Sequence, residues 1–211
     1  MSFRPILRHA AFALPLLLTA CAGIAPPAEQ KEASTQQAGQ IRSFHEAIDL
    51  GGRLSVRYER NGREEALHGS FDWHQTGSET AVTLLSPLGQ TIAIITVTPA
   101  GAALQQSGQP PRSASDVDSL TAQTLGWPLP VAGLREWLQG FALDRHGRRV
   151  VATSRTPRIN TPDGWQIRYE NWEDDATPTS QARPKRIDLS RYTEQAGEVS
   201  IRIVIDSWQA H

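Results

Sequence analysis

Two histidines and an aspartate are the side chains whose spacing comes nearest to a chemical site. His68, Asp72 and His74 share one face of a strand-like segment, opposite its apolar residues. A strand rises ~3.3 Å per residue, which places the two histidines roughly 20 Å apart and prevents them from sharing a metal ion. Asp72 and His74 could pair, although a solvated polar face also explains them. We therefore predict no metal site here.

The other candidates for catalysis fail for similar reasons. Glu173, Asp174 and Asp175 are consecutive and precede a loop that contains proline, as in a solvated turn. The serine of "LHGSF" lacks the flanking pattern of a nucleophile elbow. The two lysines, Lys31 and Lys185, lie in no glycine-rich phosphate loop. The sequence thus predicts no catalytic residue and no cofactor, and we expect that the protein is not an enzyme.

The single cysteine, Cys21, stands where lipid could be attached. Arg4 and Arg8 precede an apolar stretch that ends in "LTAC", in the manner of a secretory signal. That stretch is about a dozen residues long, whereas spanning a bilayer takes ~20. "LTAC" resembles the lipobox of bacterial lipoproteins, in which the cysteine becomes the acylated first residue. The alternative is a plain signal peptide followed by a free thiol.

The expected processing sets the domain boundaries. Residues 1–20 form the signal peptide, and residues 21–40 form an acylated cysteine with a flexible tether rich in Ala, Gln and Pro. Residues 41–211 are long enough for one domain with a core. Removing residues 1–20 leaves 19 positive and 22 negative side chains, a net charge of −3. No basic surplus indicates nucleic-acid binding.

Alternating apolar and polar residues predict a mainly β fold. The segments begin with Leu54, Val56 and Tyr58, which precede a turn signal at Asn61-Gly62. They continue through Leu67, Gly69, Phe71 and Trp73; Trp165, Ile167 and Tyr169; Ile187 and Leu189; and Val199, Ile201, Ile203 and Ile205. One apolar and one polar face on each strand indicate a single antiparallel sheet that is covered on one side.

Helical signals occur only in the middle of the chain. Asp116 or Ser115 could cap a helix with Val117, Leu120 and Leu125 on one face, and Gly126 would end it. Pro130 opens a second helix, with Val131, Leu134, Trp137 and Leu138 on one face and Gly140 at its end. We expect these helices to cover the concave side of a curved sheet.

The turn "SPLG" exposes a residue that loop tips normally avoid. Pro87 and Gly89 mark a tight turn, and Leu88 lies between them. The flanking segments, residues 82–85 and 92–97, are apolar on both faces. They are either strands buried on both sides or an apolar wall that leads to Leu88. Leu88 itself either protrudes or folds back onto the sheet.

Several segments together resemble the LolB family of outer-membrane lipoprotein receptors. They follow the lipobox in the order "GRLSVRYE", "GSFDWHQ", "LLSPLGQT", "LGWPLPVAGLREWLQG", "DGWQIRYENW", "PKRIDLS" and "IRIVIDSW". The resemblance covers nearly the whole mature domain. It implies an incomplete, half-open barrel with helices over its concave apolar face. It also implies a lipid-anchored protein of the outer membrane that faces the periplasm.

The resemblance further implies a function. Such proteins accept acylated lipoproteins from the periplasmic carrier LolA and release them into the inner leaflet of the outer membrane, so the expected partners are a LolA-like carrier, lipoprotein cargo and outer-membrane phospholipid. By the motif, Leu88 promotes insertion and Pro87 and Gly89 frame it. Phe71, Trp73, Leu85 and Trp137 are candidates for the acyl-cavity wall. We expect a monomer. The alternative is a lipid-binding or structural lipoprotein that transfers nothing.

Overall fold

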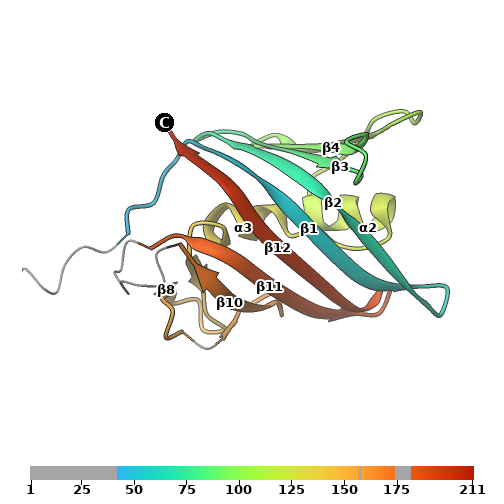
Figure 1. The fold of residues 1–211 in the computed structure, drawn as a ribbon. Coiled ribbons are helices and arrows are strands. Elements are labelled where there is room, and N and C mark those ends of the chain that lie inside the picture. Colours follow the sequence, from blue (N-terminus) through green and yellow to red (C-terminus); the bar gives the residue numbers. More distant parts are fainter. Residues whose placement is uncertain (1–41, 157, 174–181) are drawn as a thin grey trace, which may run out of the picture. The chain divides into compact units, whose positions relative to one another are not determined.

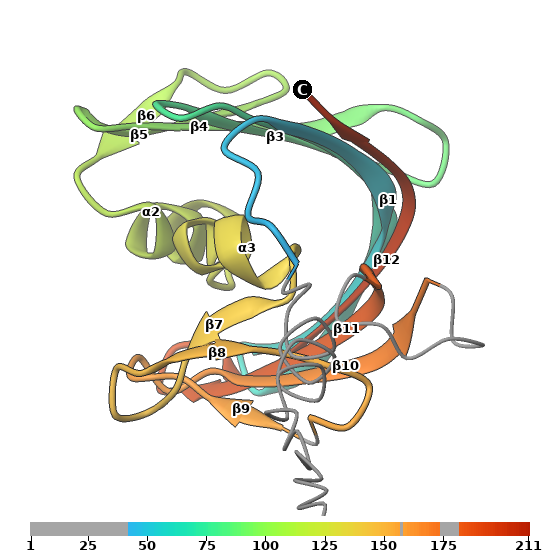
Figure 2. The ribbon, with the colours of Figure 1, turned by 90° about the vertical axis from the view of Figure 1, so that its left-hand side faces the viewer.

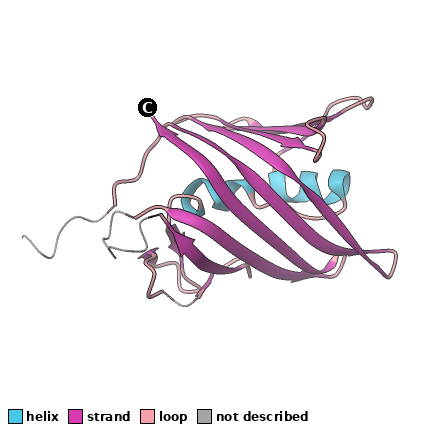
Figure 3. Cartoon of the chain, in the orientation of Figure 1, coloured by secondary structure: helices cyan, strands magenta, loops and turns pink. Residues whose placement is uncertain are grey.

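The computed structural model describes residues 42–156, 158–173 and 182–211, which form one open antiparallel sheet that curves around two helices (Figures 1 and 3). Cys21 and the predicted signal peptide and tether lie outside the described residues. The sheet order within those residues is β6-β5-β4-β3-β2-β1-β12-β11-β10-β9. The two end strands, β6 and β9, do not pair with each other, so the expected incomplete barrel is confirmed.

The strands of the main sheet follow the chain order on either side of the helices. Before the helices come β1 (Ile48–Arg60), β2 (Arg63–Gln75), β3 (Thr80–Leu85), β4 (Thr91–Thr98), β5 (Gly101–Gln106) and β6 (Arg112–Ala114). After them come β9 (Ile159–Asn160), β10 (Gln166–Trp172), β11 (Pro184–Thr193) and β12 (Gly197–Ala210). A separate hairpin pairs β7 (Phe141–Leu143) with β8 (Arg149–Val151).

The alternating pattern places the core on the concave side of the sheet. On β12, Val199, Ile201 and Ile203 are buried, whereas the intervening Ser200 and Arg202 face outward. The pairing of β1 with β12 sets Val56 opposite Ile201 and so joins apolar residues across the strands. The predicted strands are confirmed, and their apolar faces form one continuous core.

Two short helices fill the concave side (Figure 2). Helix α2 (Val117–Leu125) begins at Asp116, whose side chain accepts a hydrogen bond from the Ser119 amide, and ends at Gly126 with φ of 90°. Helix α3 (Val131–Trp137) follows Pro130. It ends three residues before the predicted stop at Gly140, because the chain tightens into i→i−3 hydrogen bonds after Trp137.

The strands β3 and β4 are not buried on both sides. Their inward residues, such as Leu84 and Ile95, are buried, but Ile94 on the opposite face is 43% exposed. Leu85 and Ile92 are only partly buried. The interpretation as fully buried strands is therefore wrong, and the sheet carries apolar side chains on its outer face next to the Leu88 turn.

A buried arginine links the segment before β1 to the core. The sequence patterns did not predict this contact. Arg42 is only 7% exposed. Its guanidinium donates hydrogen bonds to four carbonyl oxygens, those of Gln139, Gly140, Ala152 and Ala182. It also lies 4.8 Å from the centre of the Trp172 ring. Burial lowers the pKa of Arg42 from its usual value.

Candidate functional site

An apolar cavity lies between the sheet and α3. Its wall is formed by side chains of the sheet, of α3 and of the residues flanking that helix: Leu54, Phe71, Trp73, Val82, Leu84, Leu129, Leu134, Leu138, Ile201 and Ile203. The cavity has a volume of about 20 Å³. By this measure ~10–15 Å³ is needed to hold one water molecule, so the arrangement has no room for an acyl chain. The site can shelter lipid only if the helices move away from the sheet.

The candidate wall residues differ in their positions. Phe71 and Trp73 line the cavity. Trp137 is buried on α3, but it packs edge-to-face against Trp165, with ring centres 6.3 Å apart, and is not among the lining residues. Leu85 is partly exposed at the end of β3 and also lies outside the lining. Phe71 and Trp73 thus lie at the cavity wall in this structure and Trp137 and Leu85 do not, and contact of these residues with lipid stays a prediction.

Leu88 protrudes from the loop between β3 and β4. It is 87% exposed, the largest value among the exposed large apolar side chains of the described residues. The interpretation in which this leucine folds back onto the sheet is therefore wrong. Pro87 and Gly89 beside it are also exposed, and Gly89 has φ of 78°, a conformation that favours glycine.

The loop is held by its own hydrogen bonds. The Gly89 amide donates to the Ser86 carbonyl at 2.9 Å, and the Ser86 amide donates to the Gln90 carbonyl at 2.8 Å. The Ser86 hydroxyl accepts hydrogen bonds from the amides of Leu88 and Gln90 at 3.3 and 3.2 Å. Five residues thus form a tip that keeps the leucine outward without packing its side chain, which is an arrangement suited to touching a lipid surface.

A glycine on β2 allows the backbone at the base of this loop to pack closely against it. A Cβ added at Gly69 would overlap the carbonyl oxygen of Leu85, the last residue before the loop. The close approach of the two backbones therefore requires glycine at this position. Any larger residue would displace the chain just before Ser86.

The histidine and aspartate candidates do not form a reactive cluster. His74 Nδ1 lies 2.5 Å from Asp49, and Asp49 also contacts His211 at 2.8 Å, so Asp49 rather than Asp72 pairs with this histidine. The hydrogen bond with His74, and then that with His211, lowers the pKa of Asp49 from its usual value. In the ranges that the structure covers, no group of three or more His, Cys, Asp or Glu side chains could hold a metal ion. No helix in those ranges has the length and apolar character needed to span a bilayer.

Comparison with known proteins gives close relatives over nearly the whole chain. Residues 46–208 match the family described as outer membrane lipoprotein LolB. The outer-membrane lipoprotein LolB of Cupriavidus taiwanensis is 41% identical over 197 residues, covering 92% of each chain. That of Nitrosomonas europaea is 32% identical and covers 92% of this chain and 88% of the relative. A solved LolA superfamily structure from the same species has a TM-score of 0.45 at 14% identity, covering 85% of this chain and 93% of that chain.

Proposed function

The chain belongs to the outer membrane lipoprotein LolB family, and we propose that it accepts acylated lipoproteins from a LolA-like periplasmic carrier and releases them into the inner leaflet of the outer membrane. It is an outer-membrane lipoprotein, as its relatives are named. The observation that carries the transfer step is a leucine that is 87% exposed on a loop held by its own hydrogen bonds, beside a sheet whose concave face is apolar.

The need for a protein host follows from the energetics of acyl chains. Burying each CH₂ group is worth ~0.8 kcal/mol, so several acyl chains cannot cross water freely. An apolar concave surface lowers this cost, and α3 is the element that must shift to expose it, because Leu134 and the adjacent Leu138 form part of the cavity wall. We expect no nucleotide hydrolysis, so cargo would pass downhill from carrier to receptor to membrane.

Leu88 is the residue that we assign to membrane insertion. Burial of a leucine side chain is worth ~1.5–3 kcal/mol, which corresponds to roughly ten- to a hundredfold in a membrane encounter. Pro87 and Gly89 serve as its frame. The outward apolar side chain of Ile94 on the neighbouring strand adds to the surface that could meet lipid.

The anchor and the domain boundaries complete the proposal. Acylated Cys21 would fix the mature chain to the membrane, residues 22–40 would form the tether, and residues 41–211 would form the functional domain. Outer-membrane phospholipid is then the final acceptor, and we expect the protein to act as a monomer.

The test separates acceptance of cargo from its release. The mature lipidated protein, reconstituted in vesicles, would receive cargo from a purified LolA-like carrier, with bound and membrane-inserted cargo measured separately. Leu88→Glu should accept cargo but release it roughly ten- to a hundredfold more slowly. Leu143→Glu is a matched control, because Leu143 is 43% exposed and lies on β7, outside the loop.

Two outcomes would contradict the proposal. If the wild type binds acyl chains but never receives cargo from the carrier, the protein is the lipid-binding or structural lipoprotein of the alternative interpretation. If Leu88→Glu melts at a lower temperature and loses acceptance and release together, Leu88 is a structural residue and the insertion role fails.

A further inference from the structure

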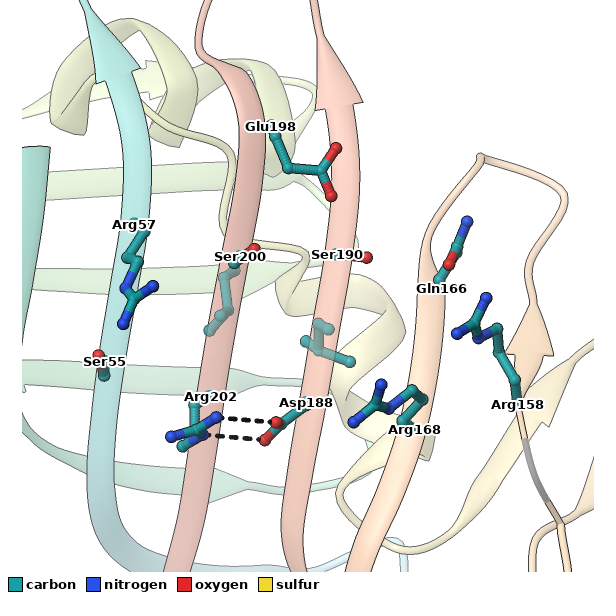
Figure 4. Close-up of a pocket in the computed structure, with 12 residues that line it drawn as sticks. Ser55, Arg57, Arg158, Gln166, Arg168, Asp188, Ser190, Glu198, Ser200 and Arg202 are labelled. Carbon is teal, nitrogen blue, oxygen red and sulfur yellow. Dashed lines mark hydrogen bonds and ion pairs between the residues drawn. The ribbon is translucent and has the colours of Figure 1, made fainter. Parts of the chain in front are cut away.

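The outer face of the sheet carries a polar hollow on the side opposite the helices (Figure 4). Its volume is about 310 Å³, and residues of β1, β10, β11 and β12 line it together with Arg158. This volume is at the lower end of the range for small-molecule sites. None of the residues of the proposed transfer site, Phe71, Trp73 or Leu88, borders it.

The hollow arises from the register of four neighbouring strands. Ser190 on β11 and Ser200 on β12 are direct cross-strand partners. Arg57 on β1 is the next partner of Ser200, and Gln166 on β10 is the next partner of Ser190. Two short side chains therefore lie between two long ones in a single row across the sheet. The serines form a floor, and the longer side chains around them form a rim.

The rim has an excess of positive charge. Four arginines line the hollow, against the two carboxylates of Asp188 and Glu198. Asp188 is already engaged, because Arg186 and Arg202 both donate hydrogen bonds to it. Its partial burial acts to raise its pKa, but these two arginines outweigh burial and hold the pKa below the usual value. The carboxylates thus leave the hollow cationic, whereas the mature chain as a whole is anionic.

Two of the arginines that line the hollow have no carboxylate partner among the described residues. Arg168 pairs with Glu170 and Arg202 with Asp188. Among the residues that the structure describes, no carboxylate lies within ion-pair distance of Arg57 or Arg158. Figure 4 shows Arg57 on the β1 side of the two serines and Arg158 beyond β10 on the other side. An anion above the serine floor would lie between these two free guanidinium groups.

We propose that this hollow is a phosphate-binding site, which takes the phosphate of a phospholipid headgroup or free phosphate. Guanidinium groups bind phosphate oxygens through paired N–H donors, and the hydroxyls of Ser190 and Ser200 supply further donors from below. A phosphate offers acceptor oxygens in several directions, which matches donors that come from different strands. Glu198 on the rim would then meet the cationic end of a zwitterionic headgroup. The site does not depend on the proposed transfer of lipoproteins.

The test is a titration of the mature lipidated protein in a detergent without phosphate groups, at constant ionic strength. Inorganic phosphate and glycerophosphoethanolamine serve as two separate probes, with binding measured by calorimetry. Arg57→Gln should weaken binding about tenfold, because it removes one free guanidinium. Ser200→Leu should abolish binding by filling the floor while leaving every charge in place. Arg63→Gln, at the exposed start of β2, removes the same charge outside the hollow and should bind like the wild type.

Each outcome has a defined meaning. Tighter binding of glycerophosphoethanolamine supports the site and identifies a lipid headgroup as its source, and tighter binding of inorganic phosphate supports the site with free phosphate as its ligand. The proposal is overturned if the wild type binds neither probe, or if Arg63→Gln weakens binding as much as Arg57→Gln. The titration does not measure cargo transfer. A failure of the proposed transfer function would therefore leave the phosphate-binding result unchanged.

Discussion

Replacing Arg42 by methionine should destabilise the domain far more than replacing an arginine that forms a surface ion pair. Methionine keeps an unbranched apolar stem against Trp172 but donates no hydrogen bonds. The carbonyls of Gln139 and Ala152, both in residues that are 0% exposed, would lose the side-chain donor that satisfies them. The Gly140 carbonyl keeps the Ala152 amide as a donor. Two unsatisfied buried acceptors cost ~1–3 kcal/mol each, partly offset because no charge is then buried.

The net loss expected for Arg42→Met is therefore about 2–4 kcal/mol, or roughly 5–15 °C in Tm for a domain of this size. The measurement is a thermal melt of the mature protein, followed by circular dichroism. Arg53→Met is the control, because Arg53 is paired with Asp206 but both side chains are well exposed. Such surface pairs contribute ~0–1 kcal/mol. If Arg42→Met melts within about 2 °C of the wild type, or if Arg53→Met has the larger effect, the carbonyl cluster does not stabilise the fold as argued.

Three further predictions concern other sites. Burial, and to a lesser extent the negative charge of nearby Asp116, raises the pKa of Asp118 to about 6. Between about pH 4 and pH 6 the folded state therefore retains a proton that the unfolded state has lost. The free energy of unfolding should accordingly fall as the pH rises through this range. Asp118→Asn should accordingly raise Tm at pH 7 but not at pH 4, and melts that show the same gain at both values would refute this assignment. Gly69→Ala should shift the loop base and slow cargo release more than acceptance in the transfer assay; equal slowing of both steps would contradict the role of Gly69 as a seat for the loop. Cys21→Ala should yield an unprocessed or soluble periplasmic form, whereas mass spectrometry that finds unmodified Cys21 in the membrane fraction of the wild type would exclude the lipid anchor.

The sequence predicted those features of the structure that depend on residues close to one another along the chain. Alternation predicted the inward faces of the strands. Of the two possible caps of α2, Asp116 rather than Ser115 is the observed one, and Gly126 ends the helix as predicted, because capping is a local interaction. The Pro-Gly turn identified the loop that carries Leu88, and resemblance to a family suggested the role of that leucine. The end of α3 was less accurate, because Gly140 stops a tightened turn rather than the helix itself.

Features that depend on distant residues were not predictable in this way. The acceptors of Arg42 lie 97 to 140 residues away along the chain, and only the folded sheet and helices bring them together. The serine floor of the outer hollow requires the register of β11 against β12, which no single segment reveals. The size of the apolar cavity likewise depends on how closely α3 packs on the sheet, so patterning could indicate its apolar character but not that it is closed.

The open sheet also bears on the solubility of the protein before it reaches its membrane. Unpaired edge strands are templates on which other chains can add strands and aggregate, and a closed barrel avoids this hazard by having no edge. Here the two edges are formed by β6, of three residues, and β9, of two. End strands this short offer few backbone groups for a foreign strand to pair with, but β9 pairs with only two residues of β10, Gln166 and Ile167, so the rest of β10 has a strand partner on one side only in the described residues. At its two ends, the unclosed sheet therefore limits strand addition through the shortness of β6 and β9 rather than by closing on itself.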